Sequence, residues 1–164
     1  MKNEMELIFD AISDNEGFAR VAVSAFIAHL NPTMEEMADI KTAVSEAVTN
    51  SIIHGYENLY GYERRVGTGA EQRAVHQGKV RVHCVLENEI LHIEVIDTGR
   101  GIEDVEQAME PLFTTKPELE RSGMGFAFME AFMDDLEVDS IPGEGTTVRM
   151  VKKIGTGSWI SNED

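Results

Sequence analysis

The stretch Ile-Leu-His-Ile-Glu-Val-Ile-Asp-Thr-Gly-Arg-Gly at residues 90–101 decides the fold. Apolar and polar side chains alternate up to Asp97, which predicts a β-strand with one buried face. Residues 79–87 alternate in the same way, and the Asn88-Glu89 pair predicts a hairpin between the two strands. The second strand would deliver the Asp97 carboxylate to a sheet edge, where the glycines that follow allow close approach of a ligand. A plain turn is the alternative, because Asp-x-Gly is common in turns.

Helical spacing of apolar residues precedes this hairpin. It predicts helices over 14–30 and 34–54, and Gly55 would end the second helix. Thr33, with Glu36 three residues later, forms the signature of a capping box at the start of that helix.

The remaining elements complete the fold class. The sequence predicts strands over 4–10, 135–140 and 145–152, a helix over 123–133 and a short acidic helical stretch near 103–109. This order of strand, two helices, strand pair, helix and strand pair indicates an α+β fold. We expect a two-layer sandwich, in which a mixed or antiparallel sheet carries helices on one face.

The chain length indicates a single domain. Its 164 residues and 18.2 kDa fit one domain, which we expect over residues 1–153. Periodicity is lost over 57–78, which predicts a surface loop, and the polar segment 154–164 predicts a loose C-terminal tail.

The charge balance restricts the partners. Lys and Arg number 14 against 30 Asp and Glu, a net charge of −16. An acidic surface repels phosphate backbones, so we expect no direct nucleic-acid binding; a basic protein partner or solubility alone explains the charge equally well. The single cysteine, Cys84, excludes an internal disulfide. No apolar segment is long enough to span a membrane and the N-terminus lacks a signal-peptide pattern, so we expect no membrane association and a cytoplasmic location.

Glu46 and Asn50 form a second candidate group on the predicted helix over 34–54. Because they are four residues apart, they lie on one face of the helix, beside the small residues Ala43 and Ala47. A carboxylate next to a carboxamide can act as a base beside an oxygen ligand for Mg²⁺. A solvated polar face is the alternative from spacing alone.

Two further segments complete the set of motifs. Ser122-Gly-Met-Gly125 precedes a predicted helix, whose N-terminal N–H groups and dipole can hold an anion. This is not a P-loop, which requires Gly-Lys followed by Ser or Thr. Gly145-Thr-Thr147 is a weaker mark at the start of the last predicted strand.

The four motifs, in this order over residues 46–147, resemble the nucleotide-binding boxes of the superfamily of gyrase, Hsp90, histidine kinases and MutL. Two segments are similar to the small serine kinases of this superfamily that act as anti-sigma factors on the sporulation sigma factor F. They are residues 46–56, Glu-Ala-Val-Thr-Asn-Ser-Ile-Ile-His-Gly-Tyr, and residues 111–126, Pro-Leu-Phe-Thr-Thr-Lys-Pro-Glu-Leu-Glu-Arg-Ser-Gly-Met-Gly-Phe. The resemblance covers nearly the whole chain and implies a Bergerat-type ATP-binding fold. The link between Asn50 and the strand at Lys79 is longer than this family leads us to expect, around residues 60–76.

The resemblance implies a role for each motif. Asn50 would ligate the Mg²⁺ that bridges the ATP phosphates, and Glu46 would accept the proton of the attacking hydroxyl. Asp97 would bind the adenine amine. The remaining cofactor contacts implied by the resemblance fall on the pocket residues Gly99, Gly101, Thr146 or Thr147, the lid residues Thr114, Thr115, Lys116 and Arg121, and the phosphate loop Ser122, Gly123, Met124 and Gly125.

Partners follow from the same resemblance. Such a protein binds a sigma factor, phosphorylates a serine on the anti-anti-sigma factor, and forms a homodimer. Phe18, Val21 and Phe26 would serve either that dimer interface or the core. We expect Arg20 to contact a partner, because it is a lone cation among apolar residues; an ion pair with Glu16 is the alternative.

Two other functions compete with a kinase that is also an anti-sigma factor. One is the catalytic domain of a two-component histidine kinase, which lacks support because nothing upstream of residue 33 resembles a helical hairpin with a phosphoacceptor histidine. The other is a non-catalytic ATP-dependent binding module, against which Glu46 argues because a pure binder needs no base there.

Overall fold

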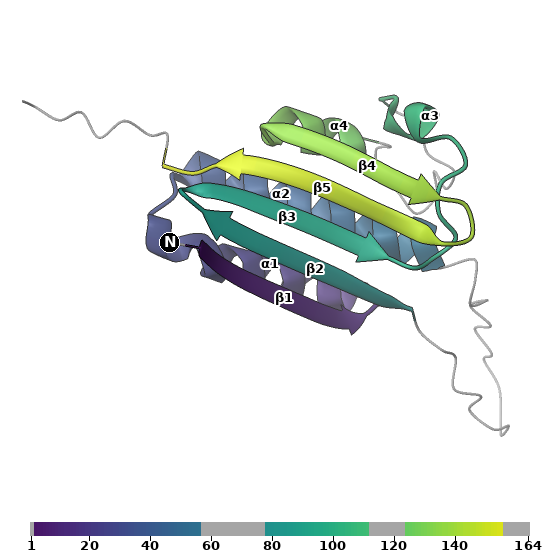
Figure 1. Ribbon diagram of the computed structural model, residues 1–164, viewed down its shortest axis with the longest axis horizontal. Coiled ribbons are helices and arrows are strands. Elements are labelled where there is room, and N and C mark those ends of the chain that lie inside the picture. Colours follow the sequence, from purple (N-terminus) through teal and green to yellow (C-terminus); the bar gives the residue numbers. More distant parts are fainter. Residues whose placement is uncertain (1, 57–77, 112–123, 156–164) are drawn as a thin grey trace, which may run out of the picture.

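A five-stranded antiparallel sheet forms one layer of the protein (Figure 1). The computed structural model describes residues 2–56, 78–111 and 124–155. The strand order is β1-β2-β3-β5-β4, and every neighbouring pair is antiparallel. The strands are β1 (Lys2–Asp10), β2 (Lys79–Glu87), β3 (Ile90–Asp97), β4 (Asp135–Ile141) and β5 (Gly145–Lys153). The α+β class is therefore confirmed.

Helices α1, α2 and α4 cover one face of this sheet (Figure 1). The helices are α1 (Asp14–Ile27), followed by the 3₁₀ turn η1 (Ala28–Leu30), α2 (Met34–Asn50), α3 (Val105–Met109) and α4 (Gly125–Phe132). The capping box is confirmed: the Glu36 N–H donates to Thr33 Oγ1 at 3.1 Å, and the Thr33 N–H donates to Glu36 Oε2 at 2.8 Å.

The end of α2 differs from the sequence prediction. Gly55 does not end a regular helix, because α2 continues as a π-helical turn, η2 (Ser51–Tyr56). Gly55 lies inside this turn, and a Cβ atom there would be only 3.1 Å from Asp97 Oδ1. The missing side chain at Gly55 therefore lets the end of β3 pack directly on the helical backbone.

The hairpin between β2 and β3 forms as predicted. Glu87 pairs with Ile90, and the connecting residues Asn88 and Glu89 both have positive φ, at 52° and 64°. Two such residues give the turn the twist that antiparallel strands require.

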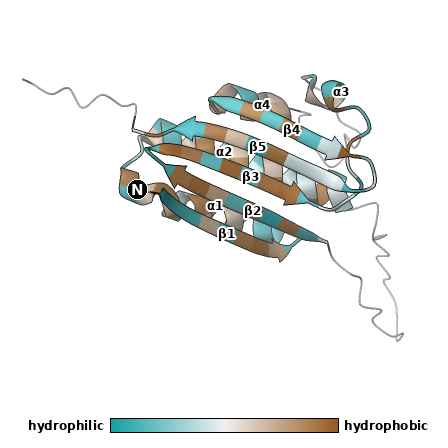
Figure 2. Ribbon diagram, in the orientation of Figure 1, coloured by the Kyte–Doolittle hydropathy of each residue, from teal (hydrophilic) through white to brown (hydrophobic). Residues whose placement is uncertain are grey.

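The core lies between the helices and the inner face of the sheet. Hydrophobic and hydrophilic residues alternate along β2 and β3 (Figure 2). Residues such as Val82 and Ile93 are fully buried opposite Val44 and Val48 of α2. Ile154 is also fully buried and its N–H donates to the Glu89 carbonyl, so packing continues beyond residue 153, where a loose tail was expected.

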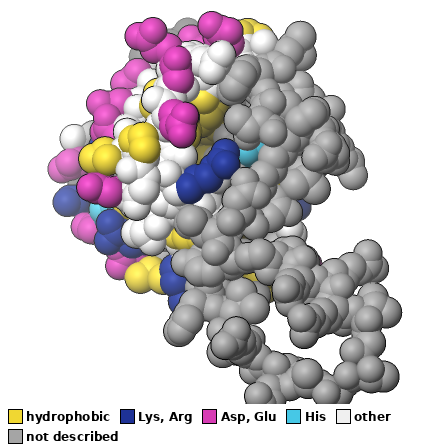
Figure 3. Space-filling view, turned by 90° about the vertical axis from the view of Figure 1, so that its right-hand side faces the viewer, with side chains coloured by type: hydrophobic (Ala, Val, Ile, Leu, Met, Phe, Trp, Pro, Cys, Tyr) yellow, Lys and Arg dark blue, Asp and Glu magenta, His cyan; other side chains and the backbone are white. Residues whose placement is uncertain are grey.

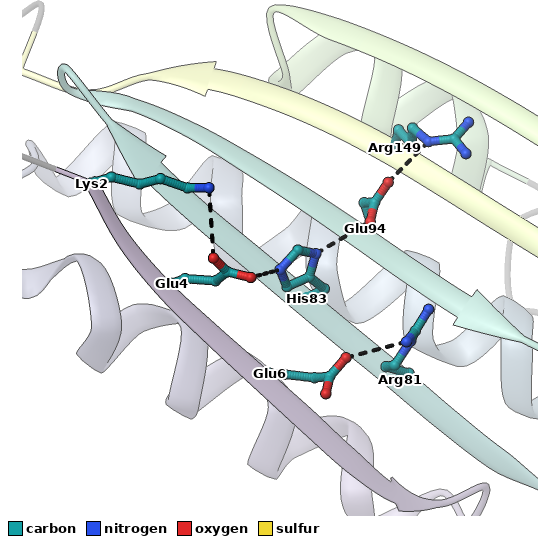
Figure 4. Close-up of polar contacts among 7 residues, drawn as sticks. All are labelled: Lys2, Glu4, Glu6, Arg81, His83, Glu94 and Arg149. Atoms are coloured by element: carbon teal, nitrogen blue, oxygen red, sulfur yellow. Dashed lines mark hydrogen bonds and ion pairs between the residues drawn. The ribbon is translucent and has the colours of Figure 1, made fainter.

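The outer face of the sheet carries a chain of charged side chains, and Figure 4 shows its members on β1, β2, β3 and β5. His83 Nε2 lies 2.8 Å from Glu4 Oε1 and His83 Nδ1 lies 3.3 Å from Glu94 Oε2. Glu94 then accepts from Arg149 Nε at 3.0 Å, and Arg149 also pairs with Asp139. None of the described helices combines the length and apolar character needed to cross a bilayer.

Candidate nucleotide site

A cavity of about 560 Å³ lies where the ends of β3 and β5 meet the helical layer. Small-molecule sites in proteins are typically about 300–1,000 Å³, so the cavity can hold a ligand of nucleotide size. The sequence-predicted residues that line it are Asn50, Asp97, Gly101, Gly125 and Thr146. These residues come from four separate segments, and the fold brings them together.

Asp97 is the buried acceptor of this cavity. Its side chain is only 5% exposed, and burial is the main cause that raises the pKa of its carboxyl. Hydrogen bonds from the Gly99 N–H, at 3.0 Å, the Ser51 hydroxyl and the Thr146 N–H act in the opposite direction. The carboxylate is thus held by donors yet still borders the cavity, where it can accept a hydrogen bond from a ligand amine.

The π-helical turn η2 positions the chain that leaves β3. The Gly55 carbonyl accepts from the Arg100 N–H at 3.0 Å, and a Cβ atom at Gly99 would overlap that carbonyl group. Gly101 has φ of 70°, and a Cβ atom there would overlap the Ile141 carbonyl oxygen. Gly99 and Gly101 are therefore required by close approach of the protein's own backbone, whereas the sequence predicted that they allow close approach of a ligand.

Glu46 and Asn50 meet the N-terminus of α4. A Cβ atom at Gly125 would lie 3.1 Å from Glu46 Oε2 and 3.3 Å from Asn50 Nδ2. The carboxylate and the carboxamide are therefore neighbours on α2, and both face the first residue of α4.

Only one of the two candidate threonines of β5 reaches the cavity. Thr146 pairs with Asp97 across the sheet, and its Oγ1 lies 2.8 Å from Ser140 Oγ. Successive side chains of a strand point to opposite faces, so Thr147 points to the outer face and is not among the described cavity residues.

The lid and most of the phosphate loop lie outside the described residues. These positions are Thr114, Thr115, Lys116, Arg121, Ser122 and Gly123. Met124, by contrast, is the N-cap of α4 and directly precedes Gly125.

Several residues of the site were given no role by the sequence. Ser51 binds Asp97, Ser140 binds Thr146, and Tyr56 bonds to the backbone beside Asp97. Ser51 and Tyr56 bond to residues more than 40 positions later in the chain, and Ser140 meets Thr146 through the pairing of β4 with β5, so spacing along the chain did not indicate these contacts.

Acidic side chains gather over the upper part of the end of the molecule seen in Figure 3. The acidic residues that line the cavity include Glu103, Asp104 and Glu110, whereas Arg100 is the one arginine or lysine among the described lining residues. An anionic ligand at this mouth would therefore need additional positive charge, from a metal ion or from another segment.

The residues present fit a magnesium–nucleotide complex. Asn50 and Glu46 offer the hard oxygen atoms that Mg²⁺ prefers, Asp97 offers a buried acceptor, and a Cβ atom at Gly125 would intrude between the helices.

Arg20 lies apart from the cavity, on α1. Its Nη1 is 3.7 Å from Glu16 Oε1, which is the ion pair considered as the alternative to a partner contact. On the same helix, Phe18 and Val21 are 55% and 61% exposed, whereas Phe26 packs against the core.

Comparison with known proteins identifies the family. Residues 13–152 match the family described as the histidine kinase-like ATPase domain. The chain is 52% identical over 162 residues to the anti-sigma F factor of Bacillus licheniformis and 51% identical over 162 residues to that of Bacillus subtilis; both matches cover 99% of this chain and 100% of the relative. The anti-sigma F factor of Thermoanaerobacter sp. (strain X514) is 54% identical over 154 residues, which cover 94% of this chain and 96% of the relative.

A solved structure shares the fold. The RsbU and RsbW domains of a Mycobacterium tuberculosis protein superpose with a TM-score of 0.61 at 20% identity, over 93% of this chain and 32% of that chain. With an ATPase-domain match over most of its length and relatives more than 50% identical from end to end, the chain belongs to the anti-sigma F factor family of histidine kinase-like ATPase domains.

Proposed function

We propose that this protein binds and inhibits the sporulation sigma factor F and, as an ATP-dependent serine kinase, phosphorylates and inactivates its anti-anti-sigma antagonist. The names of its relatives support the sigma-factor partner. The observation that carries the kinase proposal is the contact of Glu46 and Asn50 with the N-terminus of α4, beside a cavity that ends at a buried aspartate.

Asp97 would recognise the base. Its carboxylate would accept a hydrogen bond from the exocyclic amine of adenine, since the donors already on it come from the protein side. Thr146 would complete the pocket wall, while Gly99 and Gly101 keep the backbone close enough to enclose a planar ring.

Asn50 would hold Mg²⁺ through its side-chain oxygen, as the adjacent carboxylate of Glu46 makes this a favourable place for a divalent cation. When bound, the ion would neutralise phosphate charge. The N–H groups at the start of α4 would face the phosphates, together with the lid and loop residues Thr114, Thr115, Lys116, Arg121, Ser122, Gly123, Met124 and Gly125.

Glu46 would act as the general base. It would accept the proton of the substrate serine hydroxyl while that oxygen attacks the terminal phosphorus, and the rest of catalysis would be positioning and charge neutralisation. A binding module that uses ATP only to order a lid would not need this carboxylate.

The protein would act as a homodimer. Phe18 and Val21 on α1 support this, because both are large and exposed, and Phe18 makes an edge-to-face contact with Phe9 of the edge strand β1. Light scattering of Val21→Glu should then report a monomer, whereas an unchanged dimer would place the interface elsewhere.

The test of the kinase mixes the protein with Mg·ATP and the candidate antagonist and looks for phosphate by mass spectrometry. One phosphate on a serine of the antagonist supports the proposal. ATP binding without transfer would favour the binding module.

A further inference from the structure

The hydroxyl of Tyr56 is inserted into the ladder between β2 and β3. The last pair of this ladder towards the cavity is Val80 with Asp97, so the next pair in the same register would be Lys79 with Thr98. Instead of bonding to each other, these two backbones bond to the tyrosine. Tyr56 Oη donates to the Lys79 carbonyl at 2.6 Å and accepts from the Thr98 N–H at 2.8 Å.

Tyr56 is held firmly in this position. It is the last residue of η2 and only 3% exposed. Its Oη also lies 3.3 Å from Thr98 Oγ1, and its ring packs against the backbone of Gly78. The hydroxyl therefore separates the two strands immediately after Asp97, while β3 still pairs with β5 through Asp97 and Thr146.

This insertion governs where the chain goes after Asp97. Thr98 is held away from β2, so the following Gly99 can approach the Gly55 carbonyl and donate its N–H to the Asp97 carboxylate. Without the hydroxyl, the Thr98 N–H and the Lys79 carbonyl would lose this partly buried hydrogen-bond partner, and direct pairing of the two strands would satisfy both groups. Such pairing would extend the β2–β3 ladder by one rung and draw the residue after Asp97 towards β2.

We infer that Tyr56 is a positioning residue for base recognition: its hydroxyl keeps the β2–β3 ladder open after Asp97 and so holds that carboxylate in place for the amino group of adenine. Tyr56 is not among the described residues that line the cavity, so it acts through Thr98 and Asp97. The inference rests on the proposed contact between Asp97 and the base.

The test is titration calorimetry of wild type and Tyr56→Phe with Mg·ADP and Mg·IDP. IDP has a carbonyl oxygen in place of the exocyclic amine and cannot donate to Asp97 from that position, so it measures binding without the amine contact. We expect wild type to prefer ADP by at least about tenfold, and Tyr56→Phe to bind ADP about tenfold more weakly while IDP affinity changes less than about twofold. General destabilisation would weaken both nucleotides alike.

Thr42→Val is the matched control. Like Tyr56→Phe, this substitution removes one hydroxyl, here an exposed one on α2 that donates to the Ala38 carbonyl. The Thr42→Val variant should bind both nucleotides like wild type. Equal weakening of ADP and IDP in Tyr56→Phe, or no change in either, would overturn the inference. Equal binding of ADP and IDP by wild type would instead overturn the base assignment of Asp97, and the inference with it.

A second measurement needs no variant, in case Tyr56→Phe does not fold. Amide hydrogen exchange of the wild-type protein without nucleotide should show the Thr98 N–H protected, because Tyr56 already holds it. Exchange of this amide at the rate of an unpaired loop would contradict the inference.

Discussion

The ring of Tyr56 lies against the backbone of Gly78, so the two points where the segment 57–77 leaves and rejoins the described fold are in contact. A Cβ atom at Gly78 would overlap that ring, and the adjacent Lys79 carbonyl accepts from the tyrosine hydroxyl. The long link between α2 and β2 therefore starts and ends at one place, beside the nucleotide site.

We predict that residues 57–77 can be replaced by a linker of about four glycine and serine residues. Because the ends are already adjacent, loop closure changes the free energy of unfolding by less than about 2 kcal/mol. Urea unfolding and ADP titration of the shortened protein check this. Loss of ADP binding in a folded shortened protein would show that the segment contributes to the site.

Glu46→Gln should slow phosphoryl transfer strongly while preserving nucleotide binding. Loss of a general base lowers the rate of phosphoryl transfer by about 10²–10⁴-fold, whereas the isosteric amide leaves the contact with Gly125 intact. Single-turnover kinetics and ADP titration give the two quantities. Glu35→Gln, at an exposed position of α2, is the control and should match wild type; weakened ADP binding in Glu46→Gln would indicate a structural role instead.

Gly99→Ala should disrupt the turn after β3. Its Cβ atom would overlap the Gly55 carbonyl group, so we expect a loss of about 1–3 kcal/mol in the free energy of unfolding, together with weaker ADP binding. Gly17→Ala is the contrasting variant, because its Cβ atom meets only the end of the Arg20 side chain, at 3.9 Å. In the interior of α1 it should stabilise the protein by about 0.5–1 kcal/mol. Urea unfolding compares both, and equal effects would refute the assignment of Gly99.

The charge chain on the outer face predicts a pH dependence. Both ring nitrogens of His83 face carboxylates, so hydrogen bonds to Glu4 and Glu94 raise the pKa of its imidazole above the ordinary 6.5. A raised pKa means that this stabilisation is complete below pH 6.5 and is lost as the pH rises through the pKa of the folded protein. Burial raises the pKa of Glu94, but hydrogen bonds from His83 and Arg149 outweigh it and bring the pKa below 4.5. The pKa of Glu4 is also below 4.5, mainly because of its hydrogen bond to His83. The contribution of both carboxylates is therefore complete above pH 4.5 and is lost as the pH falls through their pKa values in the folded protein.

His83→Gln tests this dependence. The free energy of unfolding of wild type should exceed that of the variant by up to about 1 kcal/mol near pH 5.5, and the difference should shrink by pH 8.5. Other charged or titratable side chains also lie on this face: Lys2, Glu6, Arg81, His92 and Arg149. Because salt screens interactions between exposed charges, added salt should reduce the difference in free energy of unfolding between wild type and His83→Gln. A difference that is independent of pH would mean that His83 is not charged in the folded protein.

Arg20→Glu should weaken binding of the sigma factor, of the antagonist, or of both, by about tenfold, since reversing a charge at a contact introduces repulsion. Arg20 pairs with Glu16 at 3.7 Å but remains 44% exposed, so it is available to a partner. Lys41→Glu makes the same charge change at an exposed position of α2 and is the control. Unchanged affinity for both partners would show that Arg20 contacts neither of them and only forms its ion pair with Glu16.

Sequence periodicity was sufficient for most of the architecture. The alternation around Asn88 and Glu89 predicted the hairpin, and the Thr33–Glu36 signature predicted the start of α2, because both depend on residues close together in the chain. Four-residue spacing likewise placed Glu46 and Asn50 on one helical face, which the structure shows beside Gly125. Local geometry fixes such relationships before any tertiary contact forms.

By itself, then, the sequence determined the α+β class, the helix and strand faces, and the order of the site motifs. Only the tertiary structure decided that α2 continues as a π-helical turn, that Ser51 binds the Asp97 carboxylate, and that Tyr56 bonds to Thr98. Each of these depends on packing the end of one helix against the ends of three strands. The free energy of that packing comes from burying groups distant in the sequence, and neither spacing nor local propensity encodes which of them will meet.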